Sequence, residues 1–292
     1  MDFQYPMLLE KADEHIIQKP HMIIEPKIDG IRGILSTYPT FPLLHTRHKT
    51  NITKRFPEII SSIQTKEPCL LDGEIYCVDP STGLDDWELT MDRFHLHSNE
   101  FKIQYAVREN PAYFVIFDIL YYGKNETNAM KLPLWQRKEL LQEMVVTNAH
   151  IQLMFFSEVG KQVHDVLKSR GHEGLVVKNK NSLYYPAARR EWGKFVFYKE
   201  YKVVLTGFRH KGEFGVLCAF AQGDKLKPAG VIEFMAPEHR KTFFRYAYQN
   251  KIKEDQMNVY VHPTLNGIVK TRGLTRNGYL RTPVFVEYSI SN

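Results

Sequence analysis

The segment Glu25-Pro26-Lys27-Ile28-Asp29-Gly30-Ile31-Arg32 carries a high density of charge around one glycine and follows a short apolar stretch at residues 21–24. Asp-Gly is a common turn dipeptide, so a solvated hairpin turn is one interpretation of this octet. The other interpretation is a lysine nucleophile at the end of a strand. A lysine must lose its proton before it attacks, and a nearby cation such as Arg32 disfavours the ammonium form. Taken alone, the octet leaves both interpretations open.

The chain around this segment alternates between strand-like and helix-like patterns. Apolar runs with the length and the β-branched or aromatic content of strands lie at residues 21–24, 69–71, 113–117 and 174–177. Residues 134–146 and 160–170 instead place their apolar side chains near one helical stripe. Because strands and helices mix without a strict βαβ rhythm, we predict an α+β fold.

The pattern changes from residue 201 onward to short strands and turns. Strand-like runs lie at residues 202–208, 215–220, 230–234, 267–270 and 283–288, and one helical stretch, 237–250, begins with a proline. About five strands with one helix in roughly ninety residues fit a small barrel of the OB type. We therefore predict two domains, at residues 1–199 and 200–292.

Charge is divided unevenly between these two parts. Residues 1–199 hold 25 Lys and Arg against 25 Asp and Glu, whereas residues 200–292 hold 14 against 8. The whole net charge of +6 therefore lies in the last third of the chain. Such an excess is expected of a surface that meets a polyanion, of which nucleic acid is the usual one.

Composition disfavours several other classes of protein. With 43% hydrophobic and 25% charged residues, the chain is expected to fold rather than to stay disordered. No run approaches the roughly 20 apolar residues of a membrane span, and residues 1–6 do not resemble a signal peptide. The three cysteines have no paired spacing and the twelve histidines are scattered, so we expect neither a disulfide framework nor a zinc site.

Further short motifs follow residues 25–32 in a fixed order. They are Thr46-Arg47, Arg55-Phe56-Pro57-Glu58, Asp72-Gly73-Glu74, Phe117-Asp118, Glu173-Gly174-Leu175-Val176-Val177-Lys178 and Trp192-Gly193-Lys194. Together with Lys27-Ile28-Asp29-Gly30-Ile31-Arg32, they resemble the motifs of ATP-dependent DNA ligases of the covalent nucleotidyltransferase superfamily. Residues 272–285 are similar to the ending of the OB domain in bacterial ligases. One such motif is weak evidence, but the series covers nearly the whole chain.

The resemblance implies a fold and a reaction. The fold is a nucleotidyltransferase, or adenylation, domain with antiparallel sheets and helices, followed by a small OB-fold barrel. The reaction is ATP-dependent sealing of nicks in double-stranded DNA. Lys27 takes AMP from ATP as a phosphoramidate, the AMP passes to a DNA 5′-phosphate, and a 3′-hydroxyl then displaces it.

The resemblance also implies roles for individual residues. Lys27 is the catalytic nucleophile, and Glu25 contacts the adenine amino group while Phe117 and Val176 cover the faces of the base. Cations must be aimed at the reacting phosphates in advance, which suits Arg32, Arg47 and Lys194. Glu74 and Glu173 are expected to hold Mg²⁺ or Mn²⁺ and to contact the ribose, since carboxylates suit hard divalent ions.

Three features depart from the family pattern. The second lysine of the Trp-x-Lys-x-Lys motif is Val196 here, so we name Lys199 as the candidate that replaces it. The glycine usually found two residues after the arginine of the Arg47 motif is Lys49, which predicts a differently shaped loop. An Arg-x-Asp-Lys element is not found after Phe285, from which we expect a slower first step rather than none.

Other functions share part of this pattern. RNA ligases and capping guanylyltransferases use the same lysine motif, and a nucleic-acid-binding relative that has lost turnover is a further alternative. Residues 55–58 and 278–283 favour a DNA ligase, and the joint presence of Lys27, Glu74 and Glu173 favours an active enzyme. We expect a monomer in the bacterial cytoplasm or nucleoid, without a membrane partner, with repair or end-joining proteins acting in trans.

Overall fold

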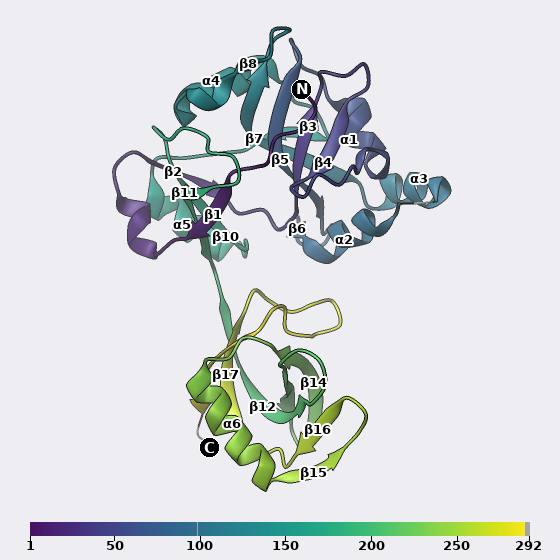
Figure 1. Ribbon diagram of the computed structural model, residues 1–292, viewed down its shortest axis with the longest axis vertical. Coiled ribbons are helices and arrows are strands. Elements are labelled where there is room, and N and C mark those ends of the chain that lie inside the picture. The colour runs from purple at the N-terminus through teal and green to yellow at the C-terminus, as the bar shows by residue number, and fades with distance from the viewer. Residues whose placement is uncertain (98, 290–292) are drawn as a thin grey trace. The chain divides into compact units, whose positions relative to one another are not determined.

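The computed structural model of the protein describes residues 1–97 and 99–289 and divides the chain into two compact units, Met1–Val196 and Phe197–Asn292 (Figure 1). Each unit has its own sheet structure and its own hydrophobic core. The division falls three residues before the boundary expected from the sequence. The two units are described separately below.

The first unit is built on two sheets. The larger has seven strands, namely β3 (Ile31–Ser36), β4 (Leu43–Thr46), β5 (Cys69–Val78), β6 (Asp85–Asp86), β7 (Ala112–Tyr122), β8 (Thr127–Asn128) and β9 (Ile151–Leu153). They follow the order β4-β3-β5-β7-β8, with β6 beside β5 and β9 beside β7. The smaller sheet has the order β1 (Leu8–Lys11), β11 (Arg189–Val196), β10 (Gly174–Asn179), β2 (Met22–Pro26). The pairs β1–β11 and β7–β9 are parallel, and the other strand pairs are antiparallel.

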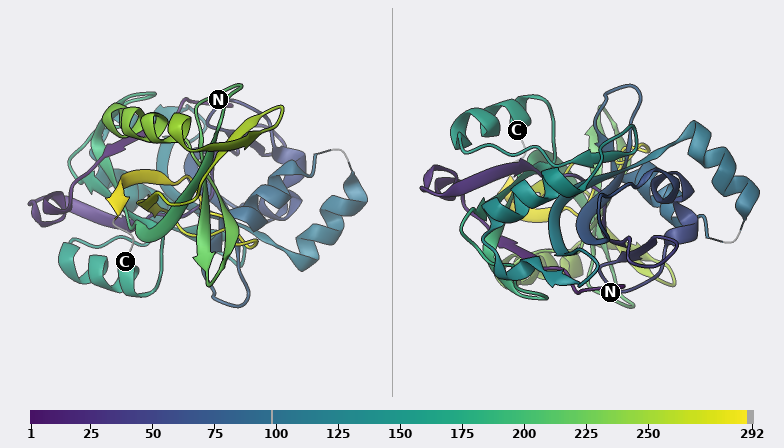
Figure 2. Two further views of the ribbon diagram at one scale, coloured as in Figure 1. Left: turned by 90° about the horizontal axis from the view of Figure 1, so that it is seen from below. Right: turned by 90° about the horizontal axis from the view of Figure 1, so that it is seen from above.

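Helices pack against both sheets. They are α1 (Pro57–Ser62), α2 (Trp87–His95), α3 (Glu100–Glu109), α4 (Leu134–Met144) and α5 (Gly160–Ser169), with short 3₁₀ helices η1 (Glu14–Gln18), η2 (Thr53–Arg55) and η3 (Ala129–Lys131). The helices predicted at residues 134–146 and 160–170 are confirmed as α4 and α5. The α2–α3 pair lies at the opposite end of this unit from α5 (Figures 1 and 2).

A layer of apolar side chains joins the two sheets of the first unit. Ile34 and Leu70 from the larger sheet share one buried cluster with Ile23 and Trp192 from the smaller sheet. Side chains alternate between faces along a strand, so Arg32 lies on the same face as Ile34, and Glu74 on the same face as Leu70. The face that carries these charged residues is therefore turned toward the smaller sheet.

The second unit is a curled antiparallel sheet with one helix. Its strands are β12 (Lys199–Arg209), β13 (Val216–Gln222), β14 (Lys225–Ile232), β15 (Lys251–Glu254), β16 (Asn258–Val261), β17 (Asn266–Thr271) and β18 (Val284–Ser289), and its helix is α6 (Pro237–Gln249). The long strand β12 pairs with β17 along its first half, with β16 at its end and with β13 along its second half. An isolated bridge between Phe234 and Val284 joins the segment after β14 to β18. Phe243 and Ala247 of α6 fill the core of this unit, and the helix predicted at residues 237–250 is confirmed.

Two further observations concern membrane-spanning helices and the cysteines. In the part of the chain that the structure describes, no helix is both long enough and apolar enough to cross a membrane. Cys69, Cys77 and Cys218 are buried thiols, and burial raises the pKa of each to about 12.

Candidate active site

Lys27 is placed by the turn that connects β2 to β3. Its backbone N–H donates to the carbonyl of Gly174 over 3.0 Å, which ties the turn to the start of β10. Gly30 lies so close to β5 that a Cβ atom there would be 2.3 Å from the carbonyl oxygen of Ile75. Asp29 is buried as well. The segment is therefore a packed turn between two sheets, and the interpretation as a solvated hairpin is wrong.

The ammonium of Lys27 contacts a carboxylate from the neighbouring strand. Its Nζ atom lies 2.5 Å from Oε2 of Glu173, and the two side chains are 15% and 4% exposed. Glu173 comes directly before β10, where a Cβ atom on Gly174 would be 2.1 Å from the carbonyl oxygen of Phe195. The glycine thus lets β10 and β11 pair closely at the point where Glu173 leaves the sheet.

Glu74 belongs to the same electrostatic cluster. It lies on β5 opposite Arg32 of β3. Burial raises its pKa to about 7, Arg32 and Lys27 act against that rise, and the like charge of Glu173 adds to it. Since Lys27, Arg32 and Glu173 all act on this carboxyl group, the four residues lie close together between the sheets.

Arg32 is held by a buried carboxylate. Its Nε and Nη2 atoms lie 2.5 and 2.6 Å from the two oxygens of Asp72, and the hydroxyl of Tyr184 donates to Oδ2 of the same group over 2.6 Å. Burial opposes the charge of the guanidinium, but Asp72 raises the pKa of Arg32 above its ordinary value. The cation is therefore fixed in charge and in orientation.

Phe117 lies on β7 between two cations. The guanidinium carbon of Arg32 is 4.5 Å from the ring centroid, and Nζ of Lys178 is 4.3 Å from it. Cations are attracted to the face of an aromatic ring. A planar base that stacks on this ring would take the place of one of them.

Glu25 is a fully buried carboxylate that two lysines hold. Its Oε2 atom accepts from Nζ of Lys178 over 2.6 Å, and Oε1 accepts from Nζ of Lys138 on α4. Burial alone would raise the pKa of Glu25, but the two ammonium groups lower it below its ordinary value. The Nζ atom of Lys178 also lies 4.2 Å from the ring of Trp192. Burial lowers the pKa of Lys178 to about 8, although Glu25 opposes that change.

Val176 and Lys194 lie beside Glu25 in the smaller sheet. Val176 pairs with Glu25 across β2 and with Lys194 across β11, so the three side chains share one face. Lys178, two residues further along β10, lies on this face too. Trp192 is fully buried in the layer between the sheets and is therefore a core residue.

Arg47 lies outside this cluster, and Lys199 belongs to the second unit. Arg47 is exposed after β4, and its Nε atom lies 2.9 Å from Nε2 of His48. Lys199 is the first residue of β12 in the second unit, where it pairs with Thr271. Lys49, which stands where the family pattern has a glycine, has a φ of +64°, in the left-handed region that favours glycine.

Three residues of the site, Lys138, Lys178 and Asp85, were given no role from the sequence. Lys178 stands two residues after Val176, so strand alternation could have placed it on the same face. Lys138 interrupts the apolar stripe of α4 between Leu134 and Leu141, and a lone lysine on such a stripe calls for a buried partner. Asp85 lies outside the recognised motifs, and its contacts depend on tertiary structure.

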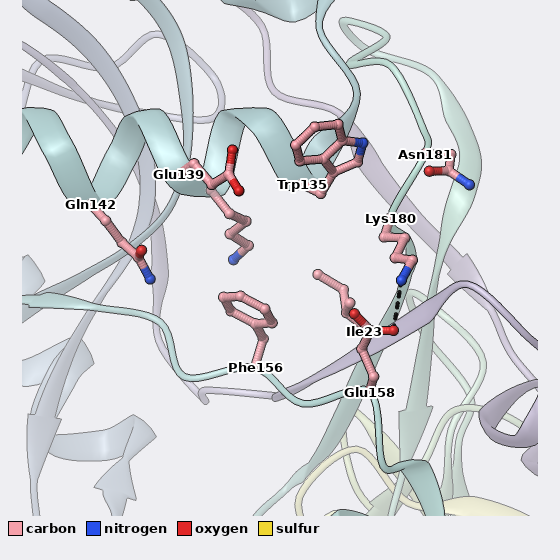
Figure 3. Close-up of a pocket in the computed structure, with 9 residues that line it drawn as sticks. Ile23, Trp135, Glu139, Gln142, Phe156, Glu158, Lys180 and Asn181 are labelled. Atoms are coloured by element: carbon pink, nitrogen blue, oxygen red, sulfur yellow. Dashed lines mark hydrogen bonds and ion pairs between the residues drawn. The ribbon is translucent and has the colours of Figure 1, made fainter.

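A pocket of about 390 Å³ lies on α4 and next to Lys138 (Figure 3). An ion pair of 2.7 Å between Lys180 and Glu158 stands at one side of it. Its lining residues are Ile23, Trp135, Lys138, Glu139, Gln142, Phe156, Glu158, Lys180 and Asn181. Lys138 links this pocket to the candidate site, because it also holds Glu25, whereas Lys27, Glu74 and Glu173 are not among the residues that line it.

A lysine in a packed turn, with carboxylates and fixed cations around it, is the arrangement that an enzyme with a lysine nucleophile acting on a phosphorylated substrate needs. Residues 6–195 match the family model described as ATP dependent DNA ligase domain. The chain therefore belongs to the family of ATP-dependent DNA ligase domains.

Individual relatives agree with this assignment. The chain is 31% identical over 290 residues to the SPbeta prophage-derived DNA ligase-like protein LigB of Bacillus subtilis (strain 168), covering 99% of this chain and 100% of that protein. Other curated DNA ligases are longer, and the matched region is 33% to 56% of their length.

Solved structures share the fold at lower identity. The ligase domain of LigD from M. tuberculosis is 20% identical, with a TM-score of 0.57 over 98% of this chain and 95% of that chain. A Lig E DNA ligase is 15% identical, with a TM-score of 0.65 over 98% of this chain and 100% of that chain.

Proposed function

We propose that the protein seals nicks in double-stranded DNA with ATP, through an AMP group carried on Lys27. The observation that carries this proposal is the contact between Lys27 and Glu173 in the packed turn after β2. Membership of the ATP-dependent DNA ligase domain family supports it, since a lysyl-AMP intermediate is characteristic of that family.

The first step transfers AMP to the enzyme. Lys27 loses a proton, its Nζ atom forms a bond to the α-phosphorus of ATP, and the bond to the bridging oxygen breaks so that pyrophosphate leaves. The AMP then passes to the 5′-phosphate at a nick, which frees Lys27. Finally the 3′-hydroxyl attacks that phosphate, forms the phosphodiester and releases AMP. The contact with Glu173 holds the Lys27 side chain in one direction before ATP enters.

The residues around Lys27 suggest how the nucleotide is held. We assign the base to the space between Phe117 and Val176, with the ionised carboxylate of Glu25 accepting from the adenine amino group. Arg32 and Lys194 face the phosphates, and preorganised cations of this kind stabilise the charge that develops during phosphoryl transfer. Arg47 and, from the second unit, Lys199 stay candidate phosphate contacts.

Two carboxylates fit a divalent cation. Among the described residues there is no group of three or more His, Cys, Asp and Glu that could hold a metal ion. Mg²⁺, however, is usually bound by one or two carboxylates together with substrate phosphates. Glu74 and Glu173 are suited to this role because each raises the cost of charge on the other, which a cation relieves. Mg²⁺ or Mn²⁺ there would supply positive charge beside the phosphates.

The second unit supports the assignment of a DNA partner. Its curled antiparallel sheet with one helix is consistent with an OB-fold, and residues 200–292 carry an excess of six positive charges. We assign residues 1–199 to the adenylation domain and residues 200–292 to the OB domain. A monomer acting on nicked DNA in the bacterial cytoplasm or nucleoid, with repair or end-joining proteins in trans, completes the proposal.

Labelling of the protein tests the first step. The purified chain is treated with pyrophosphate to remove AMP acquired during expression, and then incubated with α-labelled ATP and Mg²⁺. We expect a labelled band on a denaturing gel that is absent from Lys27→Ala. An unlabelled wild-type protein would favour the alternative of a turnover-deficient nucleic-acid-binding relative.

Sealing assays then separate the enzyme classes. We expect the labelled enzyme to join a nicked DNA duplex, and Lys27→Ala to join none. Sealing confined to nicked RNA would favour an RNA ligase. Label from GTP in place of ATP would favour a capping-type enzyme.

A further inference from the structure

We propose that Asp85 is a positioning residue that aims Lys27 during adenylation, by joining the turn that carries Lys27 to the segment that carries Glu173. The inference rests on the proposed function, because it names a residue that acts through the nucleophile. Asp85 lies in β6, a strand of two residues that pairs with the end of β5.

One oxygen of Asp85 holds the nucleophile's turn. Its Oδ2 atom accepts from the backbone N–H of Asp29 over 2.6 Å. Asp29 is two residues after Lys27 and is itself buried. This hydrogen bond therefore fixes a peptide plane in the centre of the turn, shielded from competing water.

The other oxygen faces the segment before β10. The Oδ1 atom of Asp85 lies 3.8 Å from Nδ1 of His172, which directly precedes Glu173. This buried nitrogen has no hydrogen-bond partner within the range of residues that the structure describes. A single carboxylate, 5% exposed, thus faces both of the segments that supply the Lys27–Glu173 pair.

Among the contacts that hold the turn in the described part of the chain, the one made by Asp85 comes from a side chain and can be removed by substitution. Lys27 is tied through its backbone N–H to Gly174, and Gly30 is wedged against Ile75. Between them, the peptide of Asp29 is held by the Asp85 carboxylate. Loss of that anchor leaves Lys27 able to swing, and a misplacement of about 1 Å can cost on the order of 10²-fold in rate.

Two substitutions separate positioning from charge. Asp85→Ala removes the acceptor, whereas Asp85→Asn keeps a side-chain oxygen that can accept from the N–H of Asp29. Asp86 offers a matched control, because it is the next residue of the same strand and its carboxylate caps α2, accepting from the N–H of Leu89 over 2.7 Å. Asp86→Ala loses that cap and leaves the turn of Lys27 untouched.

The experiment measures single-turnover labelling of the full chain with α-labelled ATP and Mg²⁺ at a temperature well below the melting point of each variant. For Asp85→Ala we expect the maximal labelling rate to fall on the order of 10- to 100-fold, with the half-saturating ATP concentration within about threefold of the wild-type value. Asp85→Asn should label within about threefold of the wild-type rate. Asp86→Ala should label at the wild-type rate although its melting temperature is lower.

Three outcomes would overturn the proposal: a wild-type labelling rate in Asp85→Ala, an equal fall in Asp85→Ala and Asp86→Ala, or an Asp85→Asn variant as slow as Asp85→Ala. If Asp85→Ala does not fold, Asp85→Glu takes its place. The carboxylate of Asp85→Glu is displaced by one methylene, so we expect slow labelling by a folded protein, and a wild-type rate would contradict the inference. A wild-type chain that takes no label contradicts the proposed function instead.

Discussion

Glu25, Lys138 and Lys178 form a buried group of one carboxylate and two ammonium ions next to Phe117. The carboxylate stays ionised because both lysines lower its pKa. An ionised carboxylate is only an acceptor of hydrogen bonds, and this suits the amino group of adenine better than the carbonyl oxygen of guanine. The excess positive charge is also favourable for a polyphosphate ligand.

The ionisation of Glu74 should make the free energy of unfolding depend on pH. Its carboxyl group has a pKa raised by burial from 4.5 to about 7, so the folded protein holds this proton more tightly than the unfolded chain does. The free energy of unfolding therefore falls as pH rises from about 4.5 to 7. Glu74→Gln removes a group that would otherwise have to ionise. We expect the variant to be about 3 kcal/mol more stable than the wild type at pH 8 and equally stable below about pH 4, as measured by urea unfolding.

The same substitution should abolish labelling by ATP, because a neutral amide is a weak ligand for a divalent cation. A gain in stability with a loss of activity is the pattern expected of a functional residue. A Glu74→Gln variant that is less stable than the wild type at pH 8 would contradict the raised pKa.

Lys49 carries strain that glycine would relieve. Its φ of +64° costs an L residue about 1–2 kcal/mol, and glycine avoids this cost while losing about 0.5–1 kcal/mol through the flexibility of its unfolded chain. We expect Lys49→Gly to be about 1 kcal/mol more stable than Lys49→Ala, since alanine keeps the strain. Thermal unfolding of the two variants measures the difference, and equal melting temperatures would show that the loop relaxes.

At the scale of the element, β10 links the core to the candidate site. Val176 and Lys178 point to the face that carries Glu25, while Leu175 and Val177 point to the opposite face, where α5 packs. A shift of one residue in register would exchange these two sets of side chains. The close pairing of β10 with β11 at Gly174 helps to fix that register.

Gly174→Ala tests this pairing. The added Cβ would lie 2.1 Å from the carbonyl oxygen of Phe195, so the two strands must separate beside Glu173. We expect a loss of about 2–3 kcal/mol in the free energy of unfolding together with a large fall in labelling by ATP. Gly123→Ala is a suitable control, because its site has φ +75° but no atom within 4 Å of the added Cβ, so only the strain of about 1 kcal/mol applies. Similar losses in the two variants would argue against close strand pairing at Gly174.

The elements show which parts of the fold the sequence could predict. Helices α4 and α5 were predicted because their apolar side chains recur at helical spacing. Helices α2 and α3 have no such buried apolar stripe, since their buried residues are Thr90 and Arg93 in α2 and Ile103 in α3. The Arg-Phe-Pro-Glu motif at residues 55–58 indicates only the family when it is read from the sequence. The structure gives it a packing role, since Phe56 is buried and Glu58 pairs with Arg93 of the unpredicted helix α2.

The candidate site also has a part that the sequence predicted and a part that it did not. Lys27, Arg32, Glu74 and Glu173 were named from short motifs, and the structure brings them together because each motif lies on or beside a strand of two facing sheets. The residues that hold the site in place from distant parts of the chain could not be predicted from the sequence. Lys138 is 113 residues from Glu25 in the chain and Asp85 is 56 residues from Asp29, so their contacts depend on how the elements pack.

At the scale of the whole molecule, the two units have separate cores and different charge. The excess of positive charge falls in residues 200–292, and the hairpin between β13 and β14 presents Lys225 and Lys227 as exposed residues. The cations around Phe117 in the first unit are instead buried and paired with carboxylates. Buried pairs are screened by salt much less than exposed charges are.

Salt should therefore weaken DNA binding much more than it slows labelling by ATP. If about six basic residues neutralise DNA phosphates, the affinity of the Lys27→Ala protein for a nicked duplex should fall about 10³-fold between 50 and 200 mM NaCl. Labelling of the wild-type protein by ATP needs no DNA and should change far less over that range.

Replacement of Lys225 and Lys227 by alanine should reduce the slope of log affinity against log salt by about 2, without changing the labelling rate. A slope that these substitutions leave unchanged would place the DNA contacts elsewhere, and a flat salt dependence of the intact protein would contradict the role given to the basic charge of the second unit.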